Sequence, residues 1–422
     1  MTERRNSARN LHEIEKATLG KDSVEFRGVA YPSAEGSSCI VSMPFYNEQE
    51  SLPGMLEGIS KSVLSEETYL IGVDHGSEDS SSQVFLAAQA SFKELVVIED
   101  DFAERAPAVP RKTGLDLGLA LAKQADKSLP LATVDTDVVL PINFLEEVVN
   151  FGSQFEALVF PMRHNPDMFL KCLEKQPDST RSVATQSLLG AEWFRFQMRH
   201  SLSMAGAIEP NGGGFAISSQ AYEEIGGFQP AFSPKGEIVL GANTEFGVKM
   251  KKAGLAVKLS SSVSQVSPRR VIKTLFGRQK TDGYTRTSEG AVAFTDVEYE
   301  YKQYPVLQPK EWKKYLDEQV RRGIVVALTR APFQNCLDNM KPLFGESDEW
   351  VRLLNNLELL YSKHGYINNR LYEEAVDVLG VLAYERMVSH IKEWIPEGPN
   401  LLMWAKGEKE LVDARVASLS KM

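Results

Sequence analysis

The first third of the chain contains short apolar runs with the length and spacing of buried strands. They are Cys39–Met43, Tyr69–Val73, Leu95–Ile98 and Leu129–Val134. Runs that are this short and apolar at nearly every position are typical of strands buried on both faces. Helical stretches separate them, and one of these has a repeating apolar face of Leu52, Leu56, Ile59 and Val63. The pattern predicts an α/β fold with a Rossmann-like, mostly parallel sheet flanked by helices.

Polar segments follow the predicted strands. They are Pro44–Glu48, Asp74–Ser81, Pro110–Gly114 and Asp135–Asp137. Because the carboxyl ends of parallel strands meet at one edge of the sheet, these segments are expected to share that edge. The second segment is also expected to cap the helix that follows it.

The tripeptide Asp135-Thr136-Asp137 is the main candidate for chemistry. Hard divalent cations such as Mn²⁺ or Mg²⁺ take oxygen ligands, commonly one or two carboxylates plus the phosphate oxygens of a substrate. Asp135 and Asp137 are therefore candidate metal ligands next to a diphosphate. The alternative is a solvated turn, since Asp also favours turns.

From about Cys39 to Arg270 the chain resembles the family 2 glycosyltransferases, which have the GT-A fold and use nucleotide-diphosphate sugars. The matching landmarks are Pro44–Glu48, Asp74–Asp79, Arg111-Lys112 with Gly114, Asp135–Asp137, Gly213–Ile217, Ile225–Phe228 and Gly254. None of these landmarks is specific alone. Their order and spacing together carry the resemblance.

The resemblance implies a nucleotide-sugar site made by Pro44, Tyr46, Glu48, Asp74, Arg111, Lys112, Asp135, Arg269 and Arg270. Tyr46 would stack on the base, and Asp74 would accept hydrogen bonds from the base edge. Arg111 or Lys112 would lie near the base or the diphosphate, and the later arginine pair would bind phosphate. Asp135 would face the ribose or uridine side, with Asp137 on the metal. Without the resemblance, Tyr46 is expected to be a buried aromatic and the first basic pair solvent-exposed, while the later arginine pair would face solvent or a carboxylate.

The second half of this region departs from the family pattern. Inverting members carry Glu-Asp before a helix, and its Asp is the general base, but Ala242-Asn243 stands there in this chain. Since an amide cannot act as a base, Glu245 is the replacement candidate. The alternative for Glu245 is a surface ion pair with Lys249; Glu237 and Glu209 are more distant candidates. Three outcomes remain: an inverting enzyme using Glu245, a retaining enzyme, or a binding protein without turnover.

Composition fits a cytoplasmic protein, with peripheral membrane association left open. The 422 residues include 43% hydrophobic residues, enough for a large core, and the net charge of -10 disfavours nucleic-acid binding. The cysteines Cys39, Cys172 and Cys336 are widely spaced, as in proteins of reducing compartments. No apolar leader follows Met1, and no apolar stretch is long enough to predict a transmembrane segment.

Three regions are expected: a polar N-terminal extension (1–37), a GT-A domain (38–304) and a C-terminal helical region (305–422). Inside the second region, a helix carrying Leu188 to His200 is placed where related enzymes bind acceptors. His164 and His200 are expected to be polar core or rim residues rather than ligands. The segment from Gly277 to Arg286 is expected to form a mobile loop.

Taken together, the sequence predicts a metal-dependent hexosyltransferase. The donor would be a UDP- or GDP-linked sugar, the acceptor an unidentified hydroxyl compound, and a homo-oligomer is compatible with the sequence. Two alternatives are a nucleotide-sugar-binding protein that has lost turnover and a sugar-phosphate nucleotidyltransferase. The latter class has a glycine-rich loop after its first strand, where this chain has Pro44–Glu48.

Overall fold

The computed structural model describes residues 25–27, 34–99, 108–165, 173–174, 176–204, 210–228, 231–232, 238–240, 242–267, 306–316 and 319–320. Among these, the residues up to Met162 and those from 210 to Val266 form one compact unit. The residues from Arg163 to 204, together with those from 306 onward, form a second unit. The second unit therefore includes a segment that the sequence analysis assigned to the 38–304 region.

The first unit is built on an eight-stranded sheet. In spatial order its strands are β1 (Glu25–Arg27), β4 (Glu94–Glu99), β3 (Thr68–Asp74), β2 (Cys39–Phe45), β5 (Pro130–Thr133), β9 (Phe215–Ser218), β7 (Ala157–Val159) and β12 (Val257–Leu259). Strands β4, β3, β2 and β5 are parallel neighbours, and β7 is parallel to β12. Only β1 and β9 pair antiparallel with their neighbours. The expected strands and the mostly parallel α/β sheet are confirmed.

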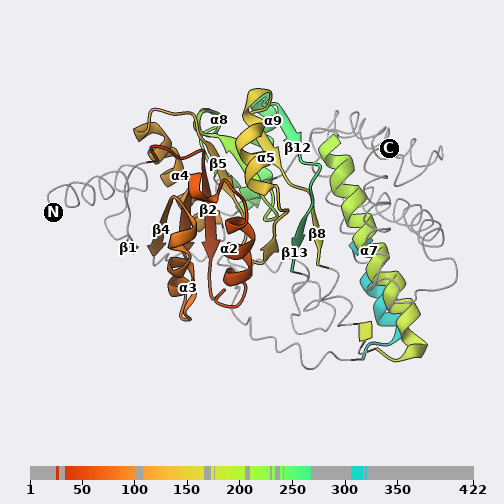
Figure 1. Cartoon of the computed structure of the whole chain (residues 1–422). Helices are drawn as coiled ribbons and strands as arrows, with labels where there is room; N and C mark the ends of the chain where they lie inside the picture. Colours follow the sequence, from red (N-terminus) through yellow and green to blue (C-terminus); the bar gives the residue numbers. More distant parts are fainter. Residues whose placement is uncertain are drawn as a thin grey trace. The chain divides into compact units, whose positions relative to one another are not determined.

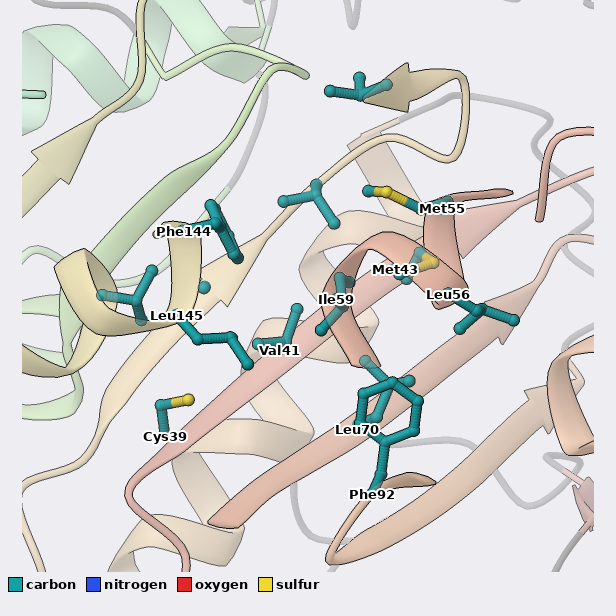
Figure 2. Close-up of a cluster of buried hydrophobic side chains, with 14 of the residues drawn as sticks. Cys39, Val41, Met43, Met55, Leu56, Ile59, Leu70, Phe92, Phe144 and Leu145 are labelled. Carbon is teal, nitrogen blue, oxygen red and sulfur yellow. The ribbon is translucent and has the colours of Figure 1, made fainter. Parts of the chain in front are cut away.

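One face of the sheet packs against α2 (Leu52–Ser60), α3 (Ser81–Ala87) and α5 (Phe144–Asn150). Alternate residues of β2, namely Cys39, Val41, Met43 and Phe45, enter this cluster, since successive side chains of a strand point to opposite faces. Figure 2 shows Val41 and Met43 beside Ile59 and Leu56 of α2, with residues of α5 at the other end of the cluster. Each fully buried side chain of this kind stabilises the fold by about 1.5–3 kcal/mol.

The opposite face is covered by α4 (Ala108–Gln124), so helices flank the sheet on both sides (Figure 1). Two glycines let α4 approach closely. A Cβ on Gly114 would lie 1.9 Å from the Oγ of Ser42, and one on Gly118 would lie 3.3 Å from a methyl carbon of Ile40. Gly114 lies against Ser42 and Gly118 lies against Ile40, so α4 runs in the direction opposite to β2. The first turn of α4, with Arg111, therefore points toward the carboxyl edge of the sheet.

Shorter elements complete the first unit. They are the 3-10 turns η1 (Ser65–Glu67), η2 (Gln89–Ser91) and η3 (Phe151–Ser153), the antiparallel pair β6 (Val138–Val139) and β13 (Ser264–Val266), the antiparallel pair β10 (Ala231–Phe232) and β11 (Ile238–Leu240), and the helices α8 (Ser219–Glu224) and α9 (Ala242–Ala253). Gly254 ends α9 with a φ of 70°, a conformation that glycine adopts without strain. Strand β8 (Met162–His164) lies where the chain passes into the second unit.

The second unit contains the long helix α7 (Asp178–Met204) and a helical segment at 309–316. Its buried side chains include Leu188, Phe194 and Trp312, and the Oε1 of Gln176 accepts the N–H of Leu307 at 3.0 Å. The expected helix around Leu188 is confirmed. The part of the expected C-terminal helical region after residue 320, and the loop at 277–286, lie outside the described residues. No helix in the described part of the chain is both long and apolar enough to cross a membrane.

Candidate functional site

The loops named by the sequence meet at the carboxyl edge of the sheet. Strands β2, β3 and β5 are parallel, so their following residues, beginning with Tyr46, His75 and Val134, leave the sheet at the same edge. Strand β9 runs in the opposite direction, with Phe215 opposite Thr133, so the segment before β9 reaches the same edge. The antiparallel β9 therefore adds residues 211–214 to the predicted set of loops.

Hydrogen bonds join the loop after β2 to the loop after β3. The backbone N–H of Asn47 donates to the Oγ of Ser77 at 3.0 Å, and that of Glu48 donates to the Oγ of Ser81 at 2.7 Å. In return, the N–H of Glu78 donates to the Oδ1 of Asn47 at 2.9 Å. Asn47 has a φ of 50°, which asparagine tolerates better than most residues. These two loops form one cross-linked wall of the site.

Asp74 lies at the base of this wall and is only 3% exposed. Its Oδ1 accepts the N–H of Ser77 at 2.8 Å, and its Oδ2 accepts the hydroxyl of Ser82. Its carboxylate thus holds the turn that leads into α3. The N-cap residue of α3, Ser80, makes no side-chain cap hydrogen bond, but the Oδ1 of Asp79 in the same segment accepts the N–H of Ser81, the first residue of the helix, at 2.9 Å. Recognition of a base edge by Asp74 stays a prediction.

The other predicted residues of the β2 loop differ in exposure. Pro44 and Tyr46 are half-buried, and the Tyr46 ring stands edge-on to His75 with the ring centroids 6.4 Å apart. Glu48 is buried, and its carboxylate accepts the hydroxyl of Ser51 at the start of α2. Tyr46 is therefore partly accessible, whereas Glu48 is buried, and stacking of Tyr46 on a base stays a prediction.

Asp135, the first carboxylate of Asp-x-Asp, is bound by Arg111. One terminal nitrogen of the guanidinium, Nη2, donates to the Oδ1 of Asp135, and the other, Nη1, donates to the Oδ1 of Asn243 at 2.9 Å. The guanidinium carbon lies 5.8 Å from the centre of the Phe228 ring, within cation–π range. Arg111 is 9% exposed, so the alternative of a solvent-exposed side chain is wrong for it. Its charge is directed at Asp135.

A run of glycines encloses the other side of Asp135. The N–H of Asp135 donates to the carbonyl of Gly212 at 2.9 Å, and a Cβ on Gly212 would lie 1.7 Å from the Oδ2 of Asp135. Asn211 shapes this segment, because its Oδ1 accepts the N–H of Gly213 at 2.8 Å. The sequence analysis named Gly213 but missed Asn211 and Gly212. Three consecutive glycines after an asparagine were the available signal for a close backbone approach.

Lys112 contacts a protein carboxylate. Its ammonium pairs with Asp116 one turn later in α4, and Asp116 also accepts the hydroxyl of Tyr222 at 2.8 Å. The Tyr222 oxygen in turn accepts the N–H of Phe228 at 3.1 Å. Burial, followed by the negative charge of Asp116, raises the pKa of Tyr222, so the phenol stays protonated and can donate. This network holds Phe228, whose ring lies beneath Arg111.

Asp137 and Glu245 are the remaining predicted residues of the described site. Asp137 is half-buried and directly precedes β6, and Glu245 is half-buried in the first turn of α9. The alternative ion pair of Glu245 with Lys249 does not appear among the described contacts, in which the ammonium of Lys249 donates to the carbonyl of Gly227 at 3.2 Å. Arg269, Arg270 and the distant candidates Glu209 and Glu237 lie outside the described residues.

The acidic side chains of the site could bind a divalent cation only if a bound ligand supplied further coordinating oxygens. Within the described ranges, no group of three or more His, Cys, Asp or Glu side chains is arranged to hold a metal. The Oδ1 of Asp135 accepts from Arg111, so the guanidinium partly neutralises that carboxylate. A cation here would need oxygens from a bound diphosphate, a common arrangement for Mg²⁺.

The second unit contains a separate polar cluster around His164. Nδ1 of His164 lies 3.0 Å from Glu192, and Nε2 lies 2.6 Å from the Nη1 of Arg195. Because arginine can only donate, Nε2 accepts and Nδ1 carries the proton of a neutral imidazole. Burial opposes ionisation of Glu192, but the charge of Arg195 and the hydrogen bonds from His164 outweigh it and hold the pKa of Glu192 well below its usual range. His164 is thus a largely buried polar residue that is bonded to two residues of α7. The side chain of His200 is not among those that the structure describes.

No protein-family model matches the sequence, and no curated protein matches it. Solved structures with similar folds include the mannosyltransferase PcManGT from Pyrobaculum calidifontis in complex with GDP-Man and Mn²⁺ (14% identity, 91% of this chain, 95% of that chain, TM-score 0.40). Another is S. aureus TarS 1-349 in complex with UDP-GlcNAc (13% identity, 83% and 91%, TM-score 0.38).

A third is glucosyl-3-phosphoglycerate synthase from Mycobacterium tuberculosis in complex with Mn²⁺, UDP and glucosyl-3-phosphoglycerate (19% identity, 55% of this chain, 72% of that chain, TM-score 0.31). All three TM-scores are below 0.5, so any functional conclusion has to come from this chain's own residues. The chain is similar in structure to proteins whose names include a mannosyltransferase and a sugar-phosphoglycerate synthase.

Proposed function

We propose that this chain is a metal-dependent glycosyltransferase that moves a sugar from a nucleotide-diphosphate donor to a hydroxyl acceptor. One observation carries the proposal: the Asp135–Asp137 turn lies at the same sheet edge as the cross-linked loops after β2 and β3. This edge of an α/β sheet is where ligands usually bind. The site thus offers carboxylates for a cation beside a wall suited to a nucleotide.

The nucleotide would lie along the cross-linked wall. Half-buried Tyr46 is our candidate for stacking on a base, and Asp74 at the foot of the wall keeps lone pairs beyond the two that it uses. Arg111 contributes by holding Asp135, which would face the ribose. We propose Arg269 and Arg270 for the diphosphate on the strength of their place in the family pattern.

Asp137 would hold the divalent cation, Mn²⁺ or Mg²⁺, with Asp135 beside it and the remaining ligands supplied by the diphosphate. When bound, the cation would supply charge neutralisation for the departing nucleoside diphosphate. The chain's own part is to place two carboxylates, Asp135 and Asp137, in one turn at the carboxyl edge of the sheet. Arg111 supports this by offsetting the negative charge of Asp135.

The acceptor hydroxyl needs a base, and Glu245 is our candidate. It is half-buried in the first turn of α9 and makes no ion pair with Lys249. Its helix is linked to the carboxylate turn through Asn243 and Arg111. A carboxylate in this place can accept a proton if the acceptor comes within hydrogen-bond reach.

The variant Glu245→Gln is expected to lower the rate of transfer at least about a hundredfold, the usual contribution of a general base. Donor binding should be nearly unchanged, because glutamine preserves the size of the side chain. Transfer rates and the donor Kd measured on the same preparation check this. Transfer at the wild-type rate would remove Glu245 as the base and favour a retaining reaction.

The function itself is tested with a panel of UDP- and GDP-linked sugars in the presence and absence of Mn²⁺. Calorimetry is expected to show donor binding that requires the cation and disappears with EDTA, and a broad panel of hydroxyl acceptors should reveal turnover. Donor binding without turnover on any acceptor would favour the binding-protein alternative. Release of pyrophosphate from a nucleoside triphosphate and a sugar phosphate would favour the nucleotidyltransferase.

We further propose membership of family 2, cytoplasmic location, and the division into regions 1–37, 38–304 and 305–422. The order of the sequence landmarks supports membership of family 2. The free, buried thiol of Cys39, whose pKa is raised by burial to about 11, is compatible with a cytoplasmic location. The loss of strand-like patterns after about Pro305 supports the boundary between the second and third regions.

A further inference from the structure

We infer that Asn243 is a positioning residue: it orients Arg111, and through Arg111 it holds Asp135 in place for the donor. This inference rests on the proposed function, since it assigns Asn243 a role in donor binding. The residue occurs where the family pattern has its general base, and an amide cannot take a proton. Its contacts supply the alternative role.

The geometry links the three residues through one rigid group. Asn243 accepts from Nη1 of Arg111 at 2.9 Å, and Nη2 of the same guanidinium donates to Asp135. A guanidinium is planar with its donors in a fixed fork, so anchoring one nitrogen sets the direction of the other. The Asn243 bond therefore aims the second bond at Asp135.

Burial makes Arg111 dependent on these partners. The side chain is 9% exposed, and its Nε has no hydrogen-bond partner among the described residues. Phe228 covers the guanidinium at 5.8 Å without accepting a conventional hydrogen bond. In the described site, the orientation of Arg111 thus depends on Asn243 and Asp135. Without the Asn243 amide, the buried Arg111 guanidinium would keep only Asp135 as a described hydrogen-bond partner and could rotate away from its present orientation.

The amide also suits this position because it is neutral. An asparagine oxygen can accept from Arg111 while the positive charge remains available to Asp135. An aspartate at 243 would place a second anion on the same guanidinium and compete with Asp135. The substitution Asn243→Asp therefore separates a positioning role from a catalytic one.

The test measures Mn²⁺-dependent binding of UDP and of GDP by calorimetry, and transfer kinetics with the donor found active. Asn243→Ala is expected to raise the Kd of the nucleotide, and the donor KM, about tenfold or more, with a smaller change in kcat. Asn243→Asp should also weaken binding and should not accelerate transfer. Asn150→Ala is the matched control, since that exposed amide donates to the carbonyl of Glu146 within α5, and no described contact links it to Arg111 or Asp135.

The outcomes separate this inference from the proposed function. If the wild-type chain binds neither nucleotide with Mn²⁺, the proposed function fails. If the wild type binds and Asn243→Ala binds equally well, the positioning role alone is overturned. An Asn243→Asp variant with faster transfer and unchanged donor affinity would also overturn it, because it would mark position 243 as a base site. Asn243→Asp keeps the side-chain size and decides the matter if the alanine variant does not fold.

Discussion

Replacing Asp137 with alanine is expected to abolish metal-supported donor binding and transfer. Asp137 is the carboxylate that we propose for the cation, and no described group of three acidic, His or Cys side chains could take over this role. Loss of the Asp137 carboxylate would therefore remove the proposed metal ligand. Metal stabilisation of a leaving group contributes several kcal/mol, which corresponds to a loss of about a thousandfold in rate.

The measurements are the donor Kd with and without Mn²⁺ and the transfer rate at saturating donor. Asp137→Asn retains the shape of the side chain and should show nearly the same loss, which separates lost charge from disturbed packing. Asp178→Ala is the control, because that aspartate is exposed at the start of α7 and pairs only with Arg181 in the described contacts. Metal-dependent donor binding that survives in Asp137→Ala would contradict the proposed metal site.

Adding a single methyl group at position 212 should disable the site without unfolding the protein. In Gly212→Ala the new Cβ would lie 1.7 Å from the Oδ2 and 2.5 Å from the Cγ of Asp135, so the carboxylate must move. Gly212 does not need a positive φ, so the substitution does not strain the backbone. The displaced Asp135 would lose its alignment with Arg111. We expect donor affinity to fall about 10- to 100-fold, as when a supporting residue of a metal site is lost.

The stability of this variant should change little, because the end of an Asp side chain can rotate away. Thermal unfolding and donor binding of Gly212→Ala are compared with those of Gly152→Ala, where a Cβ would meet nothing within 4 Å. Both variants should unfold within a few degrees of the wild type. Wild-type donor affinity in Gly212→Ala would mean that the position of Asp135 has no role in the site.

Arg111 and Lys112 are adjacent in α4 but have different partners in the folded protein. Arg111 and Lys112 were predicted together for the base or the diphosphate. In the structure the Arg111 guanidinium binds Asp135 and Asn243, while the Lys112 ammonium pairs with Asp116. Consecutive residues of a helix point about 100° apart, so one enters the site and the other follows the helix surface. The placement of Lys112 near the base or the diphosphate of a bound donor stays a prediction.

Local pattern determined much of the fold. The apolar runs that became β2, β3, β4 and β5 are identifiable because a strand buried on both faces needs apolar side chains at nearly every position. The polar segments after these runs marked the edge of the sheet, and Asp135–Asp137 marked the acidic turn. All of these signals lie within a few consecutive residues. They can therefore be read without knowing the partner of any side chain.

The connections within the site depended on tertiary structure. Arg111 meets Asn243 across 132 positions of sequence, and the carbonyl and bare Cα of Gly212 meet Asp135 only because β9 runs antiparallel to β5. The bonds between Asn47 and the residues after β3 likewise require β2 and β3 to be neighbours. Local propensity acts over a few residues, whereas hydrogen bonds and close packing depend on which segments the folded sheet brings together. The sequence alone therefore determined the strands and the acidic turn, and the tertiary structure decided which residues hold that turn in place.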